Sequence, residues 1–315
     1  IPNVKVTLMY PDHSTVSVTT DANGNYLFSD LIPENYTVSI DPSTLPSNTQ
    51  HTYEKDGTPD GSVAVVLTSG SDVTDVDFGY YVKSSIGDFV WQDTNANGIQ
   101  DSGEPGLPGV TVTLYDAGGT ALAATTTDAN GNYVFSDLLV GTYTVGVTVQ
   151  AGWVISPCQA GTDRSVDSDI QSGTGISAGI AVLGGQTITD TDAGLYQLAQ
   201  IGDAVWYDLN GNGIQDEINS GAESITVDLL DALGNVVATT VTDVSGSYLF
   251  TNLVPGQYQI KFTASANYAF TVRDAASSND SNDSDPAYST GLVSLITVVS
   301  GESKTSVDAG LTRAG

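Results

Sequence analysis

Apolar and polar residues alternate with a period of two along much of the chain, most regularly in residues 4–8, 110–114 and 143–147. Such alternation is typical of β-strands that turn one face to a core and the other to solvent. Clusters of Gly, Asn and Asp interrupt the alternating runs, for example at residues 116–119 and 128–131, and no segment keeps a helical apolar stripe through three turns. The pattern predicts an all-β protein built from antiparallel sandwiches.

The alternating pattern belongs to a sequence repeat. The motif Ile-Gly-Asp-x-Val-Trp occurs at residues 86–91 and 201–206, and Thr-Asp-x-x-Gly-x-Tyr-x-Phe occurs at 20–28, 127–135 and 242–250. Each copy closes on Asp-x-Gly, at residues 77–79, 192–194 and 308–310. Repeats of this length are whole domains. We expect three of them, over residues 1–82, 86–196 and 200–312, joined by short linkers at 82–85 and 197–200.

One loop of the second repeat concentrates oxygen-bearing residues at the spacing of a twelve-residue calcium loop. The expected ligands, at loop positions 1, 3, 5, 7, 9 and 12, are Asp93, Asn95, Asn97, the backbone carbonyl of Ile99, Asp101 and Glu104. Oxygen ligands alone select a hard cation, and a bidentate carboxylate at position 12 favours Ca²⁺. The alternative is an Asx-rich turn without metal, which the recurrence of the pattern disfavours.

The corresponding loop of the third repeat departs from the pattern at its last position. Its candidate ligands are Asp208, Asn210, Asn212, the backbone carbonyl of Ile214, Asp216 and Asn219. Asn219 supplies one oxygen where a bidentate Glu is needed, so we expect weaker calcium binding here unless Glu217 or Glu223 provides the carboxylate. The first repeat has no such loop, because Ile1 aligns with Leu107, downstream of it.

A second acidic cluster stands late in each complete repeat. Its members are Asp163, Asp167 and Asp169 in the second repeat and Asp280, Asp283 and Asp285 in the third. Closely spaced carboxylates repel one another unless a cation or a basic group intervenes. A second calcium site and a solvated acidic loop are equally open alternatives, with Arg164 and Arg273 as nearby counter-charges.

Two further features have ordinary structural explanations. Asp128 and its counterparts Asp21 and Asp243 stand in short turns with Gly, which is the strongest sequence signal for a β-hairpin. Trp91 and Trp206 each end an alternating strand and are expected to cap the core. We therefore assign neither feature to a binding site.

Composition narrows the functional classes. The 315 residues carry 37 acidic side chains against 8 Lys and Arg, a formal net charge of −29. Eight scattered bases cannot supply the clustered positive charge that nucleic acids or anionic membrane surfaces require. One cysteine, Cys158, excludes an internal disulfide. We expect no enzyme, because the paired carboxylates recur with metal-loop spacing, and no direct membrane insertion, because no apolar run is long enough to span a bilayer.

These motifs resemble the calcium-binding B repeats of serine–aspartate repeat surface proteins, part of the wider collagen-adhesin B-type group. The likeness rests on Ile-Gly-Asp-x-Val-Trp, the Asp-x-Asn-x-Asn-Gly-Ile-Gln-Asp loop, Val-Thr-Val-x-Leu, the Thr-Asp turn motif and the closing Asp-Ala-Gly. It implies three tandem Greek-key β-sandwiches of the transthyretin-like or reverse-immunoglobulin kind. The first of them lacks its N-terminal strand and calcium loop. It also implies rods outside the cell that calcium stiffens.

We therefore expect a structural protein of a prokaryotic surface, either a stalk or a secreted fibre, stiffened by calcium. The runner-up is an adhesin module that binds a host protein or a glycan. The expected partners are neighbouring copies or further repeats of the same chain. If the ends are natural, the first repeat has an open sheet edge that a neighbouring chain can fill by strand donation. The other interpretation is that the chain is part of a longer repeat protein.

Overall fold

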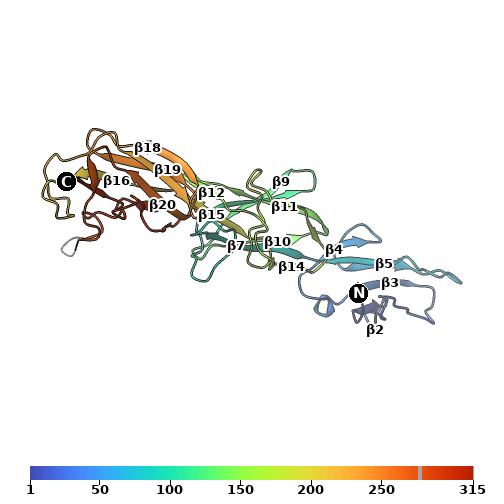
Figure 1. Cartoon of the computed structure of the whole chain (residues 1–315). Coiled ribbons are helices and arrows are strands. Elements are labelled where there is room, and N and C mark those ends of the chain that lie inside the picture. The colour runs from blue at the N-terminus through green and yellow to red at the C-terminus, as the bar shows by residue number, and fades with distance from the viewer. Residues whose placement is uncertain (276–278, 315) are drawn as a thin grey trace.

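The computed structural model describes residues 1–275 and 279–314, which form three β-sandwiches arranged end to end (Figure 1). The prediction of an all-β protein of three tandem sandwiches is confirmed. One residue separates the last strand of each repeat from the first strand of the next, Lys83 at the first junction and Leu198 at the second. The second and third repeats begin at Ser84 and Ala199, slightly earlier than expected.

The second repeat is complete and shows the design of the fold. Its strands are β7 (Ser84–Gln92), β8 (Thr111–Asp116), β9 (Ala121–Thr126), β10 (Asn132–Leu138), β11 (Gly141–Thr148), β12 (Trp153–Ile155), β13 (Ile180–Val182), β14 (Thr187–Ile188) and β15 (Ala193–Gln197). One sheet has the order β10-β7-β15-β12, with β14 also paired to β7, and the other has the order β13-β11-β8-β9. β7 runs antiparallel to β10 and parallel to β15. The first and last strands of the repeat therefore lie side by side.

The third repeat has the same topology. Its strands are β16 (Ala199–Tyr207), β17 (Thr226–Asp231), β18 (Val236–Val241), β19 (Ser247–Leu253), β20 (Gly256–Thr263), β21 (Tyr268–Phe270), β22 (Ile296–Val298), β23 (Ser303–Lys304) and β24 (Ala309–Arg313). The sheet orders are β19-β16-β24-β21, with β23 beside β16, and β18-β17-β20-β22. The first strand β16 is again parallel to the last strand β24.

The first repeat has only one full sheet. Its elements are β1 (Lys5–Met9), β2 (Thr15–Thr19), β3 (Asn35–Ile40), the 3₁₀ helix η1 (Pro42–Thr44), β4 (Thr49–Glu54), β5 (Ser62–Val66) and β6 (Phe78–Val82). The full sheet has the order β2-β1-β3-β5, and β4 and β6 form a two-stranded sheet. The counterpart of β7 is missing from this repeat.

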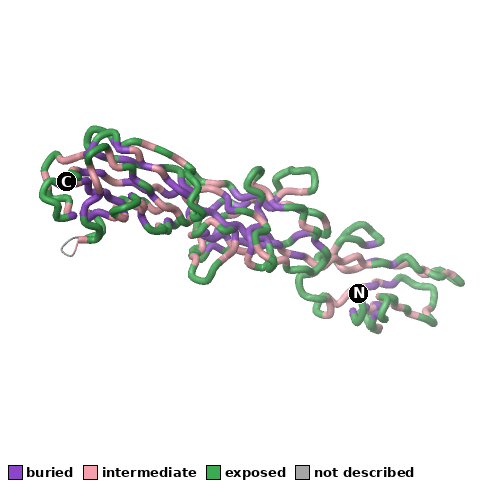
Figure 2. Tube along the Cα trace, in the orientation of Figure 1, coloured by how far each residue is buried: buried purple, intermediate pink, exposed green. Residues whose placement is uncertain are grey.

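The core of each sandwich comes from the alternating positions of the facing sheets. In the second repeat, Val112 and Leu114 of β8 meet Val145 of β11, and Ile86 and Val90 of β7 face them from the other sheet; all five are buried. The corresponding cluster in the third repeat is of similar extent, whereas that in the first repeat is smaller. Figure 2 shows this difference as a continuous buried interior in the two complete repeats and a mostly exposed or half-buried first repeat.

The tryptophan prediction is confirmed, but the hairpin prediction is wrong, because β9 and β10 belong to different sheets and do not pair with each other, and the same is true of β18 and β19. The Asp128 carboxylate accepts hydrogen bonds from the amides of Asn130 and Asn132 in the turn between β9 and β10. Asp21 and Asp243 make the same kind of turn. Trp91 and Trp206 are fully buried. The two tryptophans are therefore unavailable as a surface binding site.

Candidate metal centre

The loop that begins at Asp93 is anchored by that residue. Asp93 directly follows β7 and is fully buried, and its amide donates to the Leu195 carbonyl of β15 at 2.9 Å. Its Oδ2 accepts from the Gly98 amide at 2.8 Å and its Oδ1 from the Asn97 amide at 3.2 Å. Gly98 has φ +78°, and a Cβ there would lie 2.1 Å from the Pro157 carbonyl oxygen. Only glycine fits this turn.

The remaining side chains of the loop converge on Asp101. Asn95 and Asn97 each use Oδ1 to accept a backbone amide of the loop, and each donates its side-chain NH₂ to Asp101 Oδ2, at 2.8 and 2.9 Å. This network brings the side chains at positions 3, 5 and 9 together, with the amide NH₂ groups of the two asparagines turned to Asp101 and their oxygens turned to the loop backbone. A cation that took both amide oxygens as ligands would replace these hydrogen bonds.

Glu104 closes the loop. Its Oε1 accepts from the amide and the hydroxyl of Thr94, at 2.7 and 2.8 Å, and its Oε2 accepts from the Asp101 amide at 3.0 Å. The carboxylate thus ties position 12 to positions 2 and 9 of the same loop. The candidate ligands of the loop all offer oxygen, from a side chain or from the Ile99 carbonyl, which suits a hard cation such as Ca²⁺.

Carboxylates alone do not complete a coordination shell. Across residues 1–275 and 279–314, no group of three or more Asp, Glu, His or Cys side chains gathers in an arrangement that could hold a metal ion. Amide and backbone oxygens would therefore have to supply part of the shell, as they do in calcium loops of this length.

The third-repeat loop repeats this arrangement with a substitute for Glu104. Asp208 accepts from the amides of Asn212 and Gly213, and Asn210 and Asn212 donate to Asp216. The amide of Leu209, which corresponds to Thr94, donates to Glu217 Oε1 at 2.8 Å.

Glu217 therefore occupies the closing position that the sequence alignment assigned to Asn219. Asn219 is exposed and has φ +57°, a turn conformation that Asn tolerates. The expected ligand Asn219 is replaced in this role by a carboxylate from two residues earlier. Glu223, the other substitute considered, is exposed.

Electrostatics at Asp208 favour the charged carboxylate. Burial raises its pKa, but hydrogen bonds from the Thr271 hydroxyl and from the amides of Gly213 and Gly211 outweigh burial and hold the pKa below its usual value. Asp208 is thus ionised at neutral pH and available to a cation.

The late acidic cluster of the second repeat divides into three parts. Asp167 joins the metal loop, because it forms a β-bridge with Ile99, the residue at loop position 7. Asp169 lies elsewhere, bonded to the Asp192 amide and ion-paired with Arg164. Asp163 caps its own turn by accepting from the amide and hydroxyl of Ser165. The three carboxylates thus have separate partners and do not gather at one place, as a second calcium site, one of the two alternatives left open by the sequence, would require.

Asp167 strengthens the case for a cation at the loop. It is 1% exposed, and neither carboxylate oxygen accepts a hydrogen bond within the described residues. Its nearest basic group is Arg164, whose Nε is 4.0 Å from Oδ1. A buried carboxylate with so little compensation is costly unless a cation approaches it. Its β-bridge with Ile99, the residue at loop position 7, makes Asp167 a candidate seventh ligand.

The cluster of the third repeat divides in the same way. Asp283 bridges Ile214 of the loop, Asp285 accepts from the amide of Asp308, and Asp280 pairs with Lys304 at 3.1 Å. The equivalence of the two repeats extends from the loops to the acidic residues behind them. Arg273, considered as a counter-charge, instead contacts Asp274 at 3.3 Å.

Sequence reasoning missed a pair of carboxyl groups, the half-buried Asp88 and the buried Asp192, on neighbouring segments of one sheet. Asp88 of β7 and Asp192, just before β15, come together with Asp169 because β7 and β15 are parallel neighbours. Burial, reinforced by repulsion from Asp88 and Asp169, raises the pKa of Asp192 to about 8. Burial and repulsion from Asp190 raise that of Asp88 to about 6. The recurrence of Gly-Asp-x-Val-Trp and Asp-Ala-Gly was the available signal.

The metal loop of the second repeat touches the third repeat. The Ser300 amide in the turn before β23 donates to the Thr94 carbonyl at 2.9 Å. The Ser300 hydroxyl accepts from the Gln197 amide at 2.8 Å and lies 3.3 Å from Gln92 Nε2. At the same junction the Gly301 amide also donates to the Gln197 carbonyl, at 3.1 Å. The first junction has the equivalent bond, from the Gly185 amide to the Val82 carbonyl at 3.1 Å.

Comparison with known proteins matches the whole chain. Residues 1–80, 84–195 and 199–311 each match the family described as SdrD B-like domain. Serine-aspartate repeat-containing protein E of Staphylococcus aureus (strain USA300) is 39% identical over 290 residues, which are 90% of this chain and 24% of that protein. The bone sialoprotein-binding protein of S. aureus is 38% identical over the same length. The chain thus spans about a quarter of these curated relatives.

Solved structures with similar chains include pilins. The Bacillus anthracis TIE protein aligns with 99% of this chain and 48% of its own at 13% identity and a TM-score of 0.37. BcpA, the major pilin subunit of Bacillus cereus, aligns with 100% of this chain and 95% of its own at 13% identity and a TM-score of 0.36. Among the described residues, no helix has the length and apolar character needed to cross a bilayer. On the three matches to the repeat, the chain belongs to the SdrD B-like domain family.

Proposed function

We propose that this chain is a calcium-stiffened spacer in a stalk or fibre of the bacterial cell surface, without a catalytic role. Family membership locates it outside the cell, on a bacterial surface. Extracellular calcium is roughly millimolar, a concentration at which even the weaker calcium loops of extracellular modules fill. The two loops would hold the ion through Asp93 or Asp208 and the Asn and Asp side chains around them.

The observation that carries this proposal is the contact between loop 93–104 and the third repeat. Glu104 holds Thr94 through its amide and its hydroxyl, and the carbonyl of the same Thr94 receives the Ser300 amide. A loop that is ordered by a cation thus presents a fixed acceptor to the next repeat. The binding free energy of the ion would then stabilise both the fold of the second repeat and its junction with the third.

Thermal unfolding of the full chain with calcium and with chelator tests the proposal. An ion present at about 100 times its Kd stabilises the native state by about 2.7 kcal/mol, which corresponds to roughly 10 °C for a domain of this size. Asp93→Asn should reduce the shift for the second repeat. Asp128→Asn is the matched control, because Asp128 also accepts hydrogen bonds from two backbone amides in a turn but belongs to neither candidate calcium loop. Equal melting temperatures with calcium and chelator would remove the proposal.

Small-angle scattering separates stiffening from simple stabilisation. The maximum dimension of the chain should fall on addition of chelator at a temperature where all three repeats stay folded. Ser300→Pro removes the amide that donates to Thr94, so it should reproduce part of this loss with calcium present. Ser69→Pro, in the corresponding turn of the first repeat, is the control. If the maximum dimension changes neither with calcium nor with Ser300→Pro, the ion can still stabilise the fold but does not stiffen the chain.

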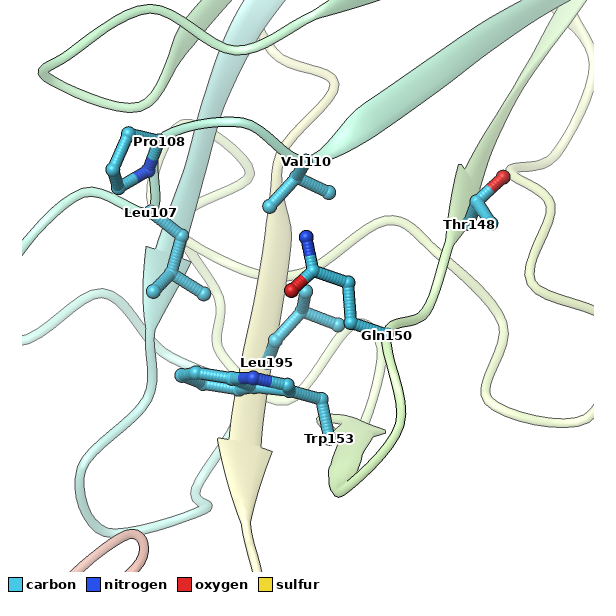
Figure 3. Close-up of a pocket in the computed structure, with 7 residues that line it drawn as sticks. All are labelled: Leu107, Pro108, Val110, Thr148, Gln150, Trp153 and Leu195. Carbon is cyan, nitrogen blue, oxygen red and sulfur yellow. The ribbon is translucent and has the colours of Figure 1, made fainter.

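The runner-up, an adhesin, needs a surface that can hold a ligand. Figure 3 shows a hollow of the second repeat where Trp153, Gln150 and Leu107 surround a space of about 60 Å³. Small-molecule sites are typically 300–1,000 Å³, so this hollow is too small for a sugar ring. Among the described residues the largely exposed aromatic side chains are Tyr53 and Tyr288, which lie in different repeats. These features favour the spacer over the adhesin.

The partners that fit this function are other repeats of the same kind. End-to-end contact between repeats already exists at both junctions within the chain. Neighbouring copies or further repeats would use the same kinds of contact, and strand donation into the first repeat would add a second kind. The net charge of −29 makes copies of the chain repel one another, so it favours a few specific contacts over unspecific clustering.

A further inference from the structure

One edge strand of each repeat contains no charged residue. β2, β9 and β18 each lie at the end of a four-stranded sheet, and among the described residues each pairs with one strand only, β1, β8 and β17 respectively. Their sequences are Thr-Val-Ser-Val-Thr, Ala-Leu-Ala-Ala-Thr-Thr and Val-Val-Ala-Thr-Thr-Val. Proteins usually protect such edges with charged side chains, with Pro or by shortening the strand. These three edges have neither charge nor Pro.

The edges of the two complete repeats are long enough to pair with a further strand. β9 and β18 have six residues each, whereas β13 and β22, at the opposite edges of the same sheets, have three. Residues 123–126 stand in regular register opposite 111–114, and residues 238–241 opposite 226–229. The register shifts fall at the first residues of β9 and β18. Each strand thus presents a regular row of unpaired backbone N–H and C=O groups.

The same edges expose apolar side chains. Leu122 of β9 is 53% exposed, and Val237 and Val241 of β18 are 53% and 59% exposed. All residues of β9 except the half-buried Thr125 are exposed. Figure 1 shows β9 and β18 at the upper outline of their repeats. A strand added to either edge would cover these side chains as well as the backbone groups.

An aspartate stands in the turn at each end of these uncharged strands. The aspartates are Asp12 and Asp21 around β2, Asp116 and Asp128 around β9, and Asp231 and Asp243 around β18. Asp116 accepts from the amides of Thr120 and Gly118, at 2.8 Å each. These hydrogen bonds hold its pKa below the usual value, so the carboxylate is ionised at neutral pH. Each edge therefore lies between two fixed negative charges.

The charges around β9 have no cation of their own repeat to neutralise them. Residues 84–197 contain a single Lys or Arg, Arg164, and it is paired with Asp169. Lys83, just before the repeat, is paired with Asp137 at 2.7 Å. The net charge of −29 makes a second copy of the chain an unfavourable occupant of this edge, whereas a basic segment would be attracted to it.

We propose that the free edges of β9 and β18 bind an extended basic segment of a partner protein, which adds a strand to the sheet and places a Lys or Arg near the aspartate at each end. Six residues of strand span roughly 20 Å, so the basic residues of the segment should be separated by about six uncharged residues. Main-chain hydrogen bonds would supply affinity, and the terminal charges would set the register. This docking surface goes beyond the spacer role and does not depend on calcium.

A synthetic peptide with Lys at both ends of six alternating Thr and Val residues tests the proposal on the full chain. NMR shifts and slowed amide exchange should appear in β9 and β18. One control peptide has Pro at its centre and keeps the charge, and the other has Glu in place of both Lys residues. Both controls should bind at least about tenfold more weakly, because Pro cannot donate to a ladder and Glu repels the aspartates.

A pair of variants tests the edge itself. Ala124 is exposed and stands opposite Thr113, on the outer face of the sheet. Ala124→Lys places a charge on the edge and should abolish the protection in β9 while leaving that in β18. Ala124→Thr is the matched control, which keeps the edge uncharged and should leave both.

Each outcome decides the proposal. Protection of β9 and β18 that needs both the Lys residues and an unbroken strand supports it. No binding, equal binding of either control peptide, protection elsewhere, or binding at β9 that survives Ala124→Lys overturns it. Self-association of the free chain that Ala124→Lys abolishes would identify a second copy as the occupant and overturn it too. Loss of the calcium-dependent melting shift would defeat the spacer stiffening alone, because these edges contain none of the loop ligands.

Discussion

Gly98→Ala should destabilise the second repeat far more than Gly103→Ala in the same loop. Both glycines have positive φ, +78° and +100°, so either substitution incurs roughly 1–2 kcal/mol of left-handed strain. A Cβ on Gly98 would also lie 2.1 Å from the Pro157 carbonyl oxygen, whereas one on Gly103 would meet nothing within 4 Å. The turn must then move by about an ångström.

That movement affects two hydrogen bonds, from the Gly98 amide to Asp93 and from the Ser168 amide to the Gly98 carbonyl. At about 1–3 kcal/mol for the charged bond and about 1 kcal/mol for the other, Gly98→Ala should cost about 3–6 kcal/mol in total, the strain included. The two variants should therefore differ by at least about 2 kcal/mol.

Denaturant unfolding followed by tryptophan fluorescence provides the assay, because Trp91 and Trp153 report on the second repeat and Trp206 on the third. Only the transition of the second repeat should move, and calcium affinity of its loop should fall with it. Equal destabilisation by Gly98→Ala and Gly103→Ala would refute the assignment of Gly98 as the turn that orders the ligands.

Three further outcomes follow from the structure. Glu217→Gln should weaken calcium binding at the third-repeat loop by about tenfold or more, while Asn219→Ala should leave it nearly unchanged; calorimetry of the two variants decides whether Glu217 closes the loop. Burial and repulsion raise the pKa of Asp308 to about 9, so native protein holds a proton that unfolded protein releases above about pH 4. In chelator, the unfolding free energy of the third repeat should therefore fall as pH rises from about 4 toward 9, and Asp308→Asn should flatten that slope. Thr127→Val removes a buried hydroxyl that joins Val110 and Leu107 and should cost about 2–3 kcal/mol, against little for the exposed Thr126→Val, in the same unfolding assay.

Features that depend on a short stretch of sequence could be predicted from the sequence alone. The Asp128 turn follows from its own few residues, and the convergence of Asn95 and Asn97 on Asp101 follows from the spacing within one loop. The strand alternation was likewise enough to define the sandwich faces. In these cases the determining interactions lie within about ten residues of each other.

Features that depend on the pairing of distant strands could not be predicted from the sequence. The Asp88 and Asp192 carboxyl groups meet only because the first and last strands of the repeat are parallel neighbours, which no local pattern encodes. The same applies to Asp167, which reaches the metal loop through a bridge to Ile99, while its neighbour Asp169 faces Asp192. Residues two apart share one side of a regular strand, but residues 167–169 form isolated bridges to different partners instead of one regular strand, so the two carboxylates reach different neighbours.

The parallel pairing of first and last strands also decides how a pulled repeat would resist. Lys83 and Leu198 are the only residues between successive repeats, so tension enters each complete repeat through its first strand and leaves through its last. Because β7 and β15 are parallel neighbours, as are β16 and β24, that force slides the two strands along each other. Their hydrogen bonds must then break together rather than one after another. Each complete repeat is thus a clamp loaded in shear.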